Sequence, residues 1–420
     1  MRLVRRSKFK VRGERFMKRS LILLMILLIS LVGISYAAST TFAYKDLLYD
    51  PRAMGMAGAM TALADSPTSA IYNPALMGEY SKLTLKLGLG VAPLDKENRD
   101  KLNTFVEYLK ALQSDSETPN GELSAVLSTG GYLHLGISKL GLTLFGNGDL
   151  NAYYYKYTAN DSSSDLQLEG NVTLDGNLKA NGALTVAIPA IDLLGLKVNL
   201  GANVRLVNEY YVNTSVQAKA TQTGVAQAIV EGQPNDNDYF RRSFNLNEQR
   251  YVSFDVGAYA RFSPFVAAGI VVKDAFGIPL EGKITSGYEE GYFSDTSGSI
   301  TTTTPYSEST SPMDVTLPDM SLKAGVFVKI PVLATRVAID ADLDKNFTPI
   351  SYRVGVEQPL FFVLTARGGA VLDANLQPQI YTLGLGANIL LVQADMAIVL
   401  DPTNMAPVAG SISGSVRFLR

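Results

Sequence analysis

From residue 81 onward, apolar and polar residues alternate along most of the chain. The segment 81–91 places four leucines at successive odd positions, with Lys, Thr or Gly between them. Segments 196–206, 253–262, 322–330 and 337–344 repeat the alternation. A period of two puts one set of side chains on each face of a β-strand. The pattern therefore predicts an all-β chain.

Three features favour a membrane barrel over a soluble β-sandwich. The alternating segments are about ten residues long, which suits tilted membrane-spanning strands better than soluble strands. They continue to the C-terminus without covering helices, and their polar face carries small residues and isolated charges, as a wet lumen permits. We predict a transmembrane antiparallel β-barrel of about 14 strands, because an even number is typical. The candidate strands span residues 81–91, 124–140, 141–157, 165–187, 196–220, 246–262, 264–274, 321–330, 334–344, 350–358, 361–372, 379–390, 392–400 and 408–419.

The fourth candidate strand leaves two interpretations open. Even positions from Leu166 to Val186 are apolar or Gly, and Asp175-Gly176 stands in the middle. A two-residue turn there would place Leu174 opposite Asn177 and break the pattern. A three-residue turn over 175–177 would keep it, and so would one unbroken strand that rises above the membrane.

Three segments between the strands have their own patterns. An apolar stripe at helical spacing predicts one short amphipathic helix from Asp95 to Gln113, packed at a barrel mouth, with a membrane-surface position as the alternative. Residues 226–247 and 286–318 are predicted to be long exposed loops, the second on the cell exterior. Tyr153-Tyr154-Tyr155 and Tyr157, with Phe361-Phe362, are predicted to form an interfacial aromatic girdle, with plain core aromatics as the alternative.

The N-terminus has the pattern of a secretory signal peptide. Lys18-Arg19 precede an apolar run of 14 residues, and small residues at Ser35 and Ala37 predict cleavage after Ala37. The run is shorter than the roughly 20 residues that a spanning helix needs, although an uncleaved anchor is the alternative. Translation starts at Met1 or at Met17, and in the second case residues 1–16 are a start-site artefact. Since no other run of 18 apolar residues exists, a membrane location requires strands.

The composition excludes several classes of function. The absence of Cys removes disulfides and thiolate metal sites. The chain has 37 Lys and Arg against 39 Asp and Glu, and nine of the basic but one of the acidic residues lie in residues 1–37. The remainder has 28 basic and 38 acidic residues, a net charge of −10. Such an acidic body is unsuited to nucleic-acid binding.

No residue pattern indicates an enzyme or a cofactor. His134 is the single imidazole, and its place in a strand indicates a lumen-facing or interfacial side chain. No nucleophile, phosphate-loop or dinucleotide motif stands in the required strand-turn-helix context. Asp340, Asp342 and Asp344 superficially match a calcium loop that lacks its Gly and its final Glu. We expect these carboxylates to line the lumen with Arg or Lys partners, a cation site being the alternative.

The segment Pro51–Leu76 is apolar and rich in small residues, yet it suits neither a long helix nor a strand. Gly55, Gly58 and Ala59 allow other backbone to approach closely. Asp65-Ser66-Pro67 and Asn73-Pro74 are turn sequences, because Pro fixes φ and Asp or Asn bonds to its own backbone. We predict a compact piece that needs other structure around it. An ordinary loop and short helix of a soluble domain is the alternative.

The motifs Arg52-x-x-Gly55-x-x-Gly58-Ala59 and Asp65-x-Pro67, followed by Tyr72-Asn73-Pro74, resemble the N-terminal signature of the FadL-type outer-membrane barrels. This superfamily includes fatty-acid and aromatic-hydrocarbon transporters and the PorV-like and TraF-like barrels. Gly355-x-Glu357, Arg367-x-Gly369 and Gly384-x-Gly386 resemble strand motifs of the PorV-like and TraF-like members. The resemblance implies a hatch inside the barrel, held by polar contacts of Arg52 and Asp65, with Asn73-Pro74 turning it towards the first strand.

The resemblance implies three regions: a signal peptide at 1–37, a plug at 38–80 and an outer-membrane barrel at 81–420. The first expected function is passive transport or binding of small hydrophobic, fatty-acid-like molecules, which predicts an apolar pocket near the plug. The alternative is a structural, secretion-related or conjugation-related barrel that acts through protein partners. A soluble periplasmic β-protein is the third. The expected partners are the lipid bilayer, hydrophobic small molecules and the barrel assembly machinery, with no cofactor.

Overall fold

The computed structural model describes residues 47, 50–64, 66, 68–80, 83–92, 100–101, 104, 121–160, 166–193, 195–221, 238–293, 300–360 and 363–418. The predicted signal peptide, Asp65, Pro67 and Phe361-Phe362 lie outside the described residues, as does most of the predicted helix 95–113. Asp100, Lys101 and Thr104 of that helix are described and are helical. No helix in the described ranges combines the length and hydropathy needed to cross a bilayer.

The described residues form one antiparallel sheet of fifteen strands. They are β1 (Leu83–Ala92), β2 (Gly121–Ile137), β3 (Leu140–Asn160), β4 (Leu166–Leu193), β5 (Leu196–Thr221), β6 (Tyr239–Ser263), β7 (Val266–Phe293), β8 (Ile300–Pro312), β9 (Ser321–Lys329), β10 (Arg336–Leu343), β11 (Pro349–Pro359), β12 (Leu364–Asp373), β13 (Pro378–Ile389), β14 (Val392–Leu400) and β15 (Pro407–Phe418).

Fourteen of these strands close into a barrel. β1 pairs with β15, and β7 pairs with both β6 and β9, so the ring has no gap in its strand order. Among the strands that the structure describes, β8 pairs only with the outer end of β7, and it stands outside the ring. The predicted 14-strand barrel is therefore confirmed.

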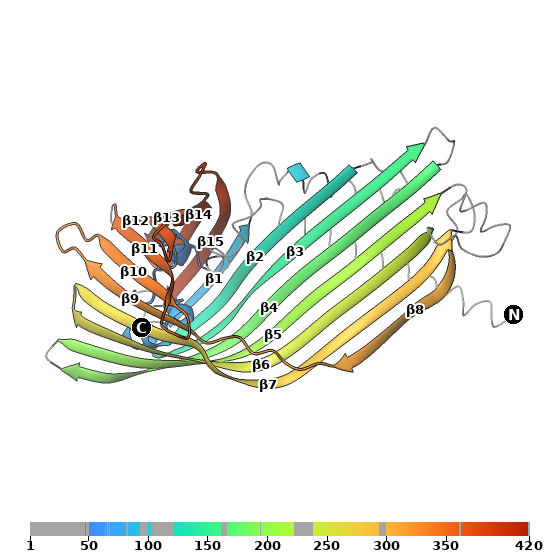
Figure 1. Cartoon of the computed structure of the whole chain (residues 1–420). Coiled ribbons are helices and arrows are strands. Elements are labelled where there is room, and N and C mark those ends of the chain that lie inside the picture. The colour runs from blue at the N-terminus through green and yellow to red at the C-terminus, as the bar shows by residue number, and fades with distance from the viewer. Residues whose placement is uncertain are drawn as a thin grey trace.

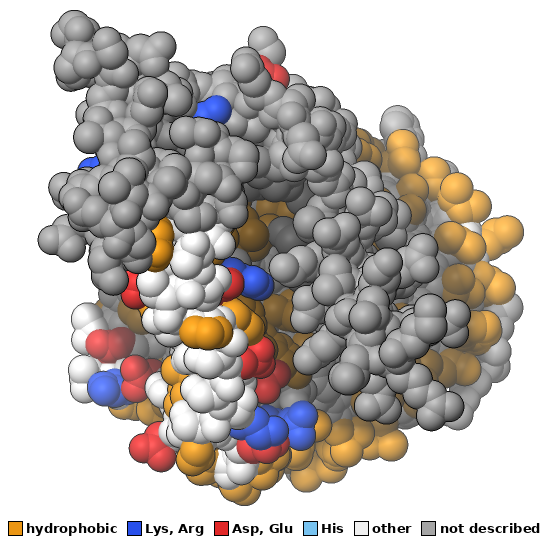
Figure 2. Space-filling view, turned by 90° about the vertical axis from the view of Figure 1, so that its right-hand side faces the viewer, with side chains coloured by type: hydrophobic (Ala, Val, Ile, Leu, Met, Phe, Trp, Pro, Cys, Tyr) orange, Lys and Arg blue, Asp and Glu red, His pale blue; other side chains and the backbone are white. Residues whose placement is uncertain are grey.

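The alternation in β1 separates a lipid-facing side from a lumen side. Leu85, Leu87 and Leu89 are 42%, 53% and 58% exposed, whereas Thr84 and Lys86 are buried inside the ring. The same division recurs around the barrel, and hydrophobic side chains gather on the outer rim (Figure 2). A band of exposed apolar side chains on the outside of a closed barrel is typical of membrane-spanning strands.

The barrel wall is much taller on one side than on the other (Figure 1). Strands β2 to β7 have 17 to 28 residues, whereas β9 to β15 have 8 to 12. We call the outer ends of β2–β7 with β8 the extension, comprising residues 121–128, 149–160, 166–177, 211–221, 239–247, 284–293 and 300–312. β4 runs unbroken through Asp175-Gly176, so the unbroken-strand interpretation is confirmed.

The two loops predicted at 226–247 and 286–318 are partly wrong. β6 begins at Tyr239, and β7 and β8 occupy 286–293 and 300–312. Every residue of β8 is exposed, so neither of its faces needs apolar residues and the period of two is absent from its sequence. The β-branched residues Thr301–Thr304 were the available strand signal.

The aromatic girdle is wrong for Tyr153 and Tyr155. β3 pairs without a register shift, so these two side chains share the lumen face with Thr143 and Phe145. Tyr154 lies on the other face but is only 4% exposed, in a cluster with Ala125 and Ala152. The period of two gives the face of each tyrosine but not the burial of Tyr154.

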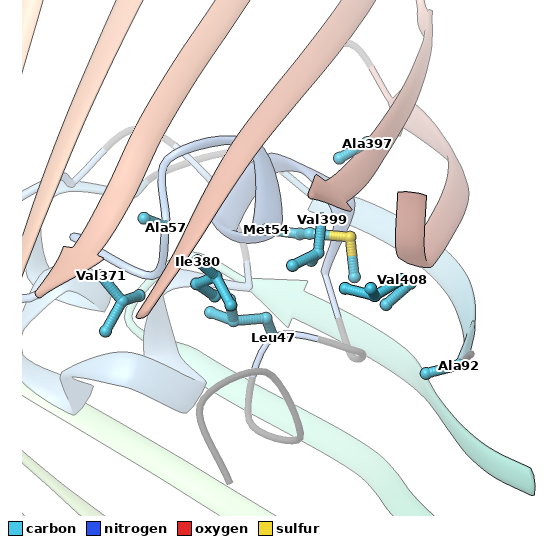
Figure 3. Close-up of a cluster of buried hydrophobic side chains, with 10 residues drawn as sticks. Leu47, Met54, Ala57, Ala92, Val371, Ile380, Ala397, Val399 and Val408 are labelled. Carbon is cyan, nitrogen blue, oxygen red and sulfur yellow. The ribbon is translucent and has the colours of Figure 1, made fainter. Parts of the chain in front are cut away.

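The hydrophobic core lies inside the barrel, between the wall and the N-terminal segment. Met54 packs against Val399 and Val408, with Leu47 beside Ile380 (Figure 3). The lumen at this level is therefore filled by protein.

Candidate functional site: the plug and the lumen around it

The described residues between 50 and 80 form a plug that contains the short helices α2 (Pro51–Gly55), α3 (Ser69–Tyr72) and η2 (Pro74–Glu79). Asp50 starts α2, because its carboxylate accepts a hydrogen bond from the Arg52 N–H at 3.1 Å and Pro51 follows it. Gly58 ends this turn with φ of +80°, a conformation that favours Gly. Asn73 starts η2 in the same way, since its side-chain oxygen accepts from the Ala75 N–H.

The barrel wall meets the plug through a ring of lumen glycines. A Cβ added at Gly257 would lie 2.1 Å from Asn73 Oδ1, and one at Gly269 would lie 2.2 Å from the Thr61 carbonyl oxygen. These positions admit no side chain without displacing the plug. The ring comprises Gly201, Gly257, Gly269, Gly325, Gly355, Gly369 and Gly384.

The α2 end of the plug is held by charge. Arg52 makes a bidentate ion pair with Glu357 of β11, at 3.0 and 3.1 Å. Glu357 also accepts from Arg336 and Arg367, both at 2.7 Å. Because Arg52 and Glu357 are almost fully buried, loss of this ion pair would destabilise the seated plug more than loss of an exposed pair would.

A second set of ion pairs reaches the same end of the plug at Asp50. Arg367 binds Asp395 at 2.8 Å, and Lys86 lies between Asp395 at 3.9 Å and Asp50 at 2.9 Å. Burial alone would raise the pKa of Asp50, but the Lys86 ammonium and hydrogen bonds from Thr68 and the Arg52 N–H bring that pKa below its ordinary value. The carboxylate is therefore charged at neutral pH.

The middle of the plug is held by backbone and amide groups. Asp340 accepts hydrogen bonds from the backbone N–H groups of Met60 and Thr61, at 2.9 and 2.8 Å. The Asn73 amide donates to the carbonyl oxygens of Thr61 at 2.9 Å and Ala258 at 3.1 Å. Asn73 therefore joins two parts of the plug to β6.

A cavity of about 270 Å³ lies between the plug and the wall. Leu47, Ile71 and Phe145 give it an apolar part. Its charged part includes Lys179, Arg205, Lys273, Lys323, Arg353, Asp255 and Asp274. The cavity therefore differs from the wholly apolar pocket that the sequence predicted.

The charged side of the cavity is internally paired. Arg205 binds Asp255 at 3.0 and 2.9 Å and also contacts Asp274. Asp342 binds Lys323 at 2.8 Å and Arg353 at 2.7 Å. The pairing fixes these long side chains along the cavity wall.

The wall next to the cavity loses its regular strand pairing. β7 pairs with β9 up to Lys273 and with β8 from Lys283 outward. Between these points, from Asp274 to Gly282, β7 has no described strand on that edge. The irregular segment 313–320 runs there, and a Cβ at Gly277 would lie 3.0 Å from the Leu317 side chain.

The structure brings most of the predicted plug residues together in the lumen. Arg52, Gly55, Gly58, Tyr72 and Asn73 are described there, with Ala59 and Pro74. Asp65 and Pro67 lie outside the described residues, so their roles stay predictions. His134 is buried on the lumen side, with its Nδ1 at 2.7 Å from Thr143 Oγ1, which confirms the lumen-facing interpretation.

The three aspartates of β10 and its turn have separate roles. Asp342 has the expected Lys and Arg partners, but Asp340 binds the plug backbone instead. Asp344 accepts from the N–H groups of Asn346 and Thr348 in an exposed turn. Among the described residues, no group of three or more His, Cys, Asp or Glu side chains could hold a metal ion.

Sequence analysis missed Lys86 and Asp395, whose ion pairs lead to Asp50 of the plug. Both stand among small or apolar neighbours at lumen-facing positions of β1 and β14. Isolated charges on the lumen side of a strand were the available signal, because a buried charge needs a partner. Their pairing across strands far apart in sequence was not readable from one chain.

No protein-family model matches the chain, and no curated protein matches its sequence. Solved structures do match. The toluene transporter TbuX of Ralstonia pickettii has a TM-score of 0.52 at 14% identity, over 88% of this chain and 98% of that one. The toluene transporter TodX of P. putida gives 0.51 at 10%, over 89% and 99%. The monoaromatic hydrocarbon channel CymD gives 0.50 at 11%, over 89% and 98%. At these identities the likeness concerns the fold.

Proposed function

We propose that this FadL-type barrel is a passive outer-membrane channel for small molecules with an apolar body, gated by the plug. The observation that carries the proposal is a plug seated by polar contacts in the lumen, with a cavity against it. The similar structures are transporters and channels for toluene and monoaromatic hydrocarbons, which supports this class of cargo.

The cavity lining favours molecules that also carry a polar group. Ile71 and Leu47 offer apolar contact, while Lys179 and Lys273 stand at the same cavity. A purely apolar molecule would fill the apolar part of the cavity but make no hydrogen bond with its charged part. Aromatic compounds with a hydroxyl or carboxyl group therefore fit better than a bare hydrocarbon.

The irregular wall at β7 offers the cargo a route out of the cavity. Lys273, Asp274 and Ser321 line the cavity and flank the edge of β7 that lacks a strand partner. A cargo molecule in its uncharged form would leave sideways into the bilayer, where its apolar body is better solvated than in water.

A disulfide across this edge tests the route. The chain has no Cys, so Gly277→Cys with Leu317→Cys gives one unambiguous crosslink. Cells expressing the double variant should take up radiolabelled benzoate or toluene more slowly after oxidation, and reduction should restore the rate. Equal uptake in both redox states would overturn the side route, and equal uptake by cells without the protein would overturn transport itself.

The proposed location follows from the same barrel. The predicted signal peptide would carry the chain across the inner membrane, and the assembly machinery would insert it into the outer membrane. Fractionation of cells on a sucrose gradient tests this location, with release into the soluble fraction as the contradicting result.

A further inference from the structure

The inner face of the extension differs in chemistry from the lumen below it. One row across five neighbouring strands consists of Asn151, Asp175, Asn213, Asn245 and Ser286. A charged side chain occurs once in this row. Amide and hydroxyl groups therefore dominate the surface.

The next row outward adds aromatic rings to the hydroxyl groups. It consists of Tyr153, Thr173, Ser215, Ser243 and Tyr288. Tyr211, which lies nearer the plug than the first row, is 45% exposed. Tyr288 of the outer row is 40% exposed. Tyrosine rings thus face the open space along the tall wall.

The polar groups of this face are held in place by one another. Asp175 accepts hydrogen bonds from Asn213 and, at 3.4 Å, from the Tyr211 hydroxyl. Ser286 donates to Asn245 at 2.8 Å, and Ser215 and Ser243 share a hydrogen bond at 2.8 Å. A surface of fixed amides needs little reordering to bind a partner, which lowers the entropic cost.

We propose that the inner face of the extension binds a neutral saccharide chain. Sugar hydroxyl groups require both donors and acceptors, which Asn, Ser and Asp side chains supply together. The C–H faces of sugar rings pack on aromatic rings such as Tyr211 and Tyr288. Five strands at a spacing of about 4.8 Å give a surface roughly 20 Å wide, enough for several sugar rings.

The charge of the face argues against other partners. A nucleic acid requires Lys and Arg for its phosphates. The two central rows have none, and Arg241 in the next row outward is paired with Glu290 at 2.8 Å. An apolar partner would bury the amide groups of Asn151 and Asn213 without hydrogen bonds. A neutral polyhydroxyl chain matches both the low charge and the density of donors and acceptors.

Affinity electrophoresis in gels that contain dextran, amylose, mannan or galactomannan tests the proposal. The purified full chain is kept in a detergent without a sugar head group. We expect retardation by at least one polysaccharide, weakened at least tenfold in Asn213→Ala and in Tyr211→Ala. Thr214→Ala is the matched control, since this neighbour lies on the opposite face of β5.

Two results would overturn the proposal: no retardation by any of the four polysaccharides, or equal retardation of the wild type and both inner-face variants. Loss of binding in Thr214→Ala as well would point to a damaged extension, and heat-modifiability of the barrel in gels identifies that case. Neither result bears on transport, because the cargo cavity lies below this face.

Discussion

The lumen at the level of the plug and the inner face of the extension are parts of the same barrel but differ in chemistry. At the plug, charges such as Arg52 and Glu357 are buried in bidentate pairs, and glycines let backbone touch backbone. On the extension, amides and hydroxyls stand in partly exposed rows. Buried charge with close packing fixes one piece of protein in place, whereas an open polar face leaves room for an external partner.

Loss of the Glu357 charge should disturb the plug most. Glu357→Gln leaves Arg52, Arg336 and Arg367 around a neutral side chain, and removal of one partner from a buried ion pair costs about 3–5 kcal/mol. We expect frequent open-channel events in planar bilayers. Glu281→Gln is the control, because Glu281 pairs with Lys283 at an exposed site and should leave the current unchanged.

A methyl group in the glycine ring should have the next largest effect. Gly257→Ala places a Cβ against Asn73, and overpacking of this kind costs about 1–3 kcal/mol. The plug should become accessible to protease while the barrel stays folded. Gly414→Ala is the matched control, since a Cβ there meets nothing within 4 Å. Equal protease resistance of the two variants would show that the ring does not seat the plug.

Loss of a single hydrogen bond to the plug should raise the open probability less than the two changes above. Thr382 Oγ1 donates to the Gly55 carbonyl oxygen at 3.3 Å, and Thr382→Val removes this bond with little change of shape. The expected loss is about 0.5–1.5 kcal/mol, which should raise the open probability only a few-fold. An effect as large as that of Glu357→Gln would contradict the ranking.

Substitutions on the extension should not change how the plug closes the lumen. Tyr211→Ala removes an exposed ring far along β5 from the plug-contacting Gly201. The bilayer current and the protease resistance of the plug should equal those of the wild type. A leaky channel in this variant would mean that the two regions are coupled.

Many of the strands and the plug motif could be predicted from the sequence, for a physical reason. The lipid-facing side of every spanning strand must be apolar, so the period of two marked β1, β5 and β9 to β15 almost residue by residue. The plug motif was readable because turns and close contacts demand Gly, Pro and Asn at fixed positions. The period of two could not predict β8, because a strand exposed on both faces has no such period, and its β-branched residues were the one signal present. The partners of Arg52 were not readable either, because alternation gives the face of Glu357 but not its neighbours across the lumen.

The most direct test of the central claim removes the plug itself. Liposome swelling with a small uncharged solute such as arabinose should compare the full chain with a version that lacks residues 38–76, both shown to be folded by heat-modifiability. If the plug closes the lumen, the shortened protein should swell the liposomes many times faster than the full chain. Equal swelling rates of two folded barrels would contradict the claim that this segment is the gate.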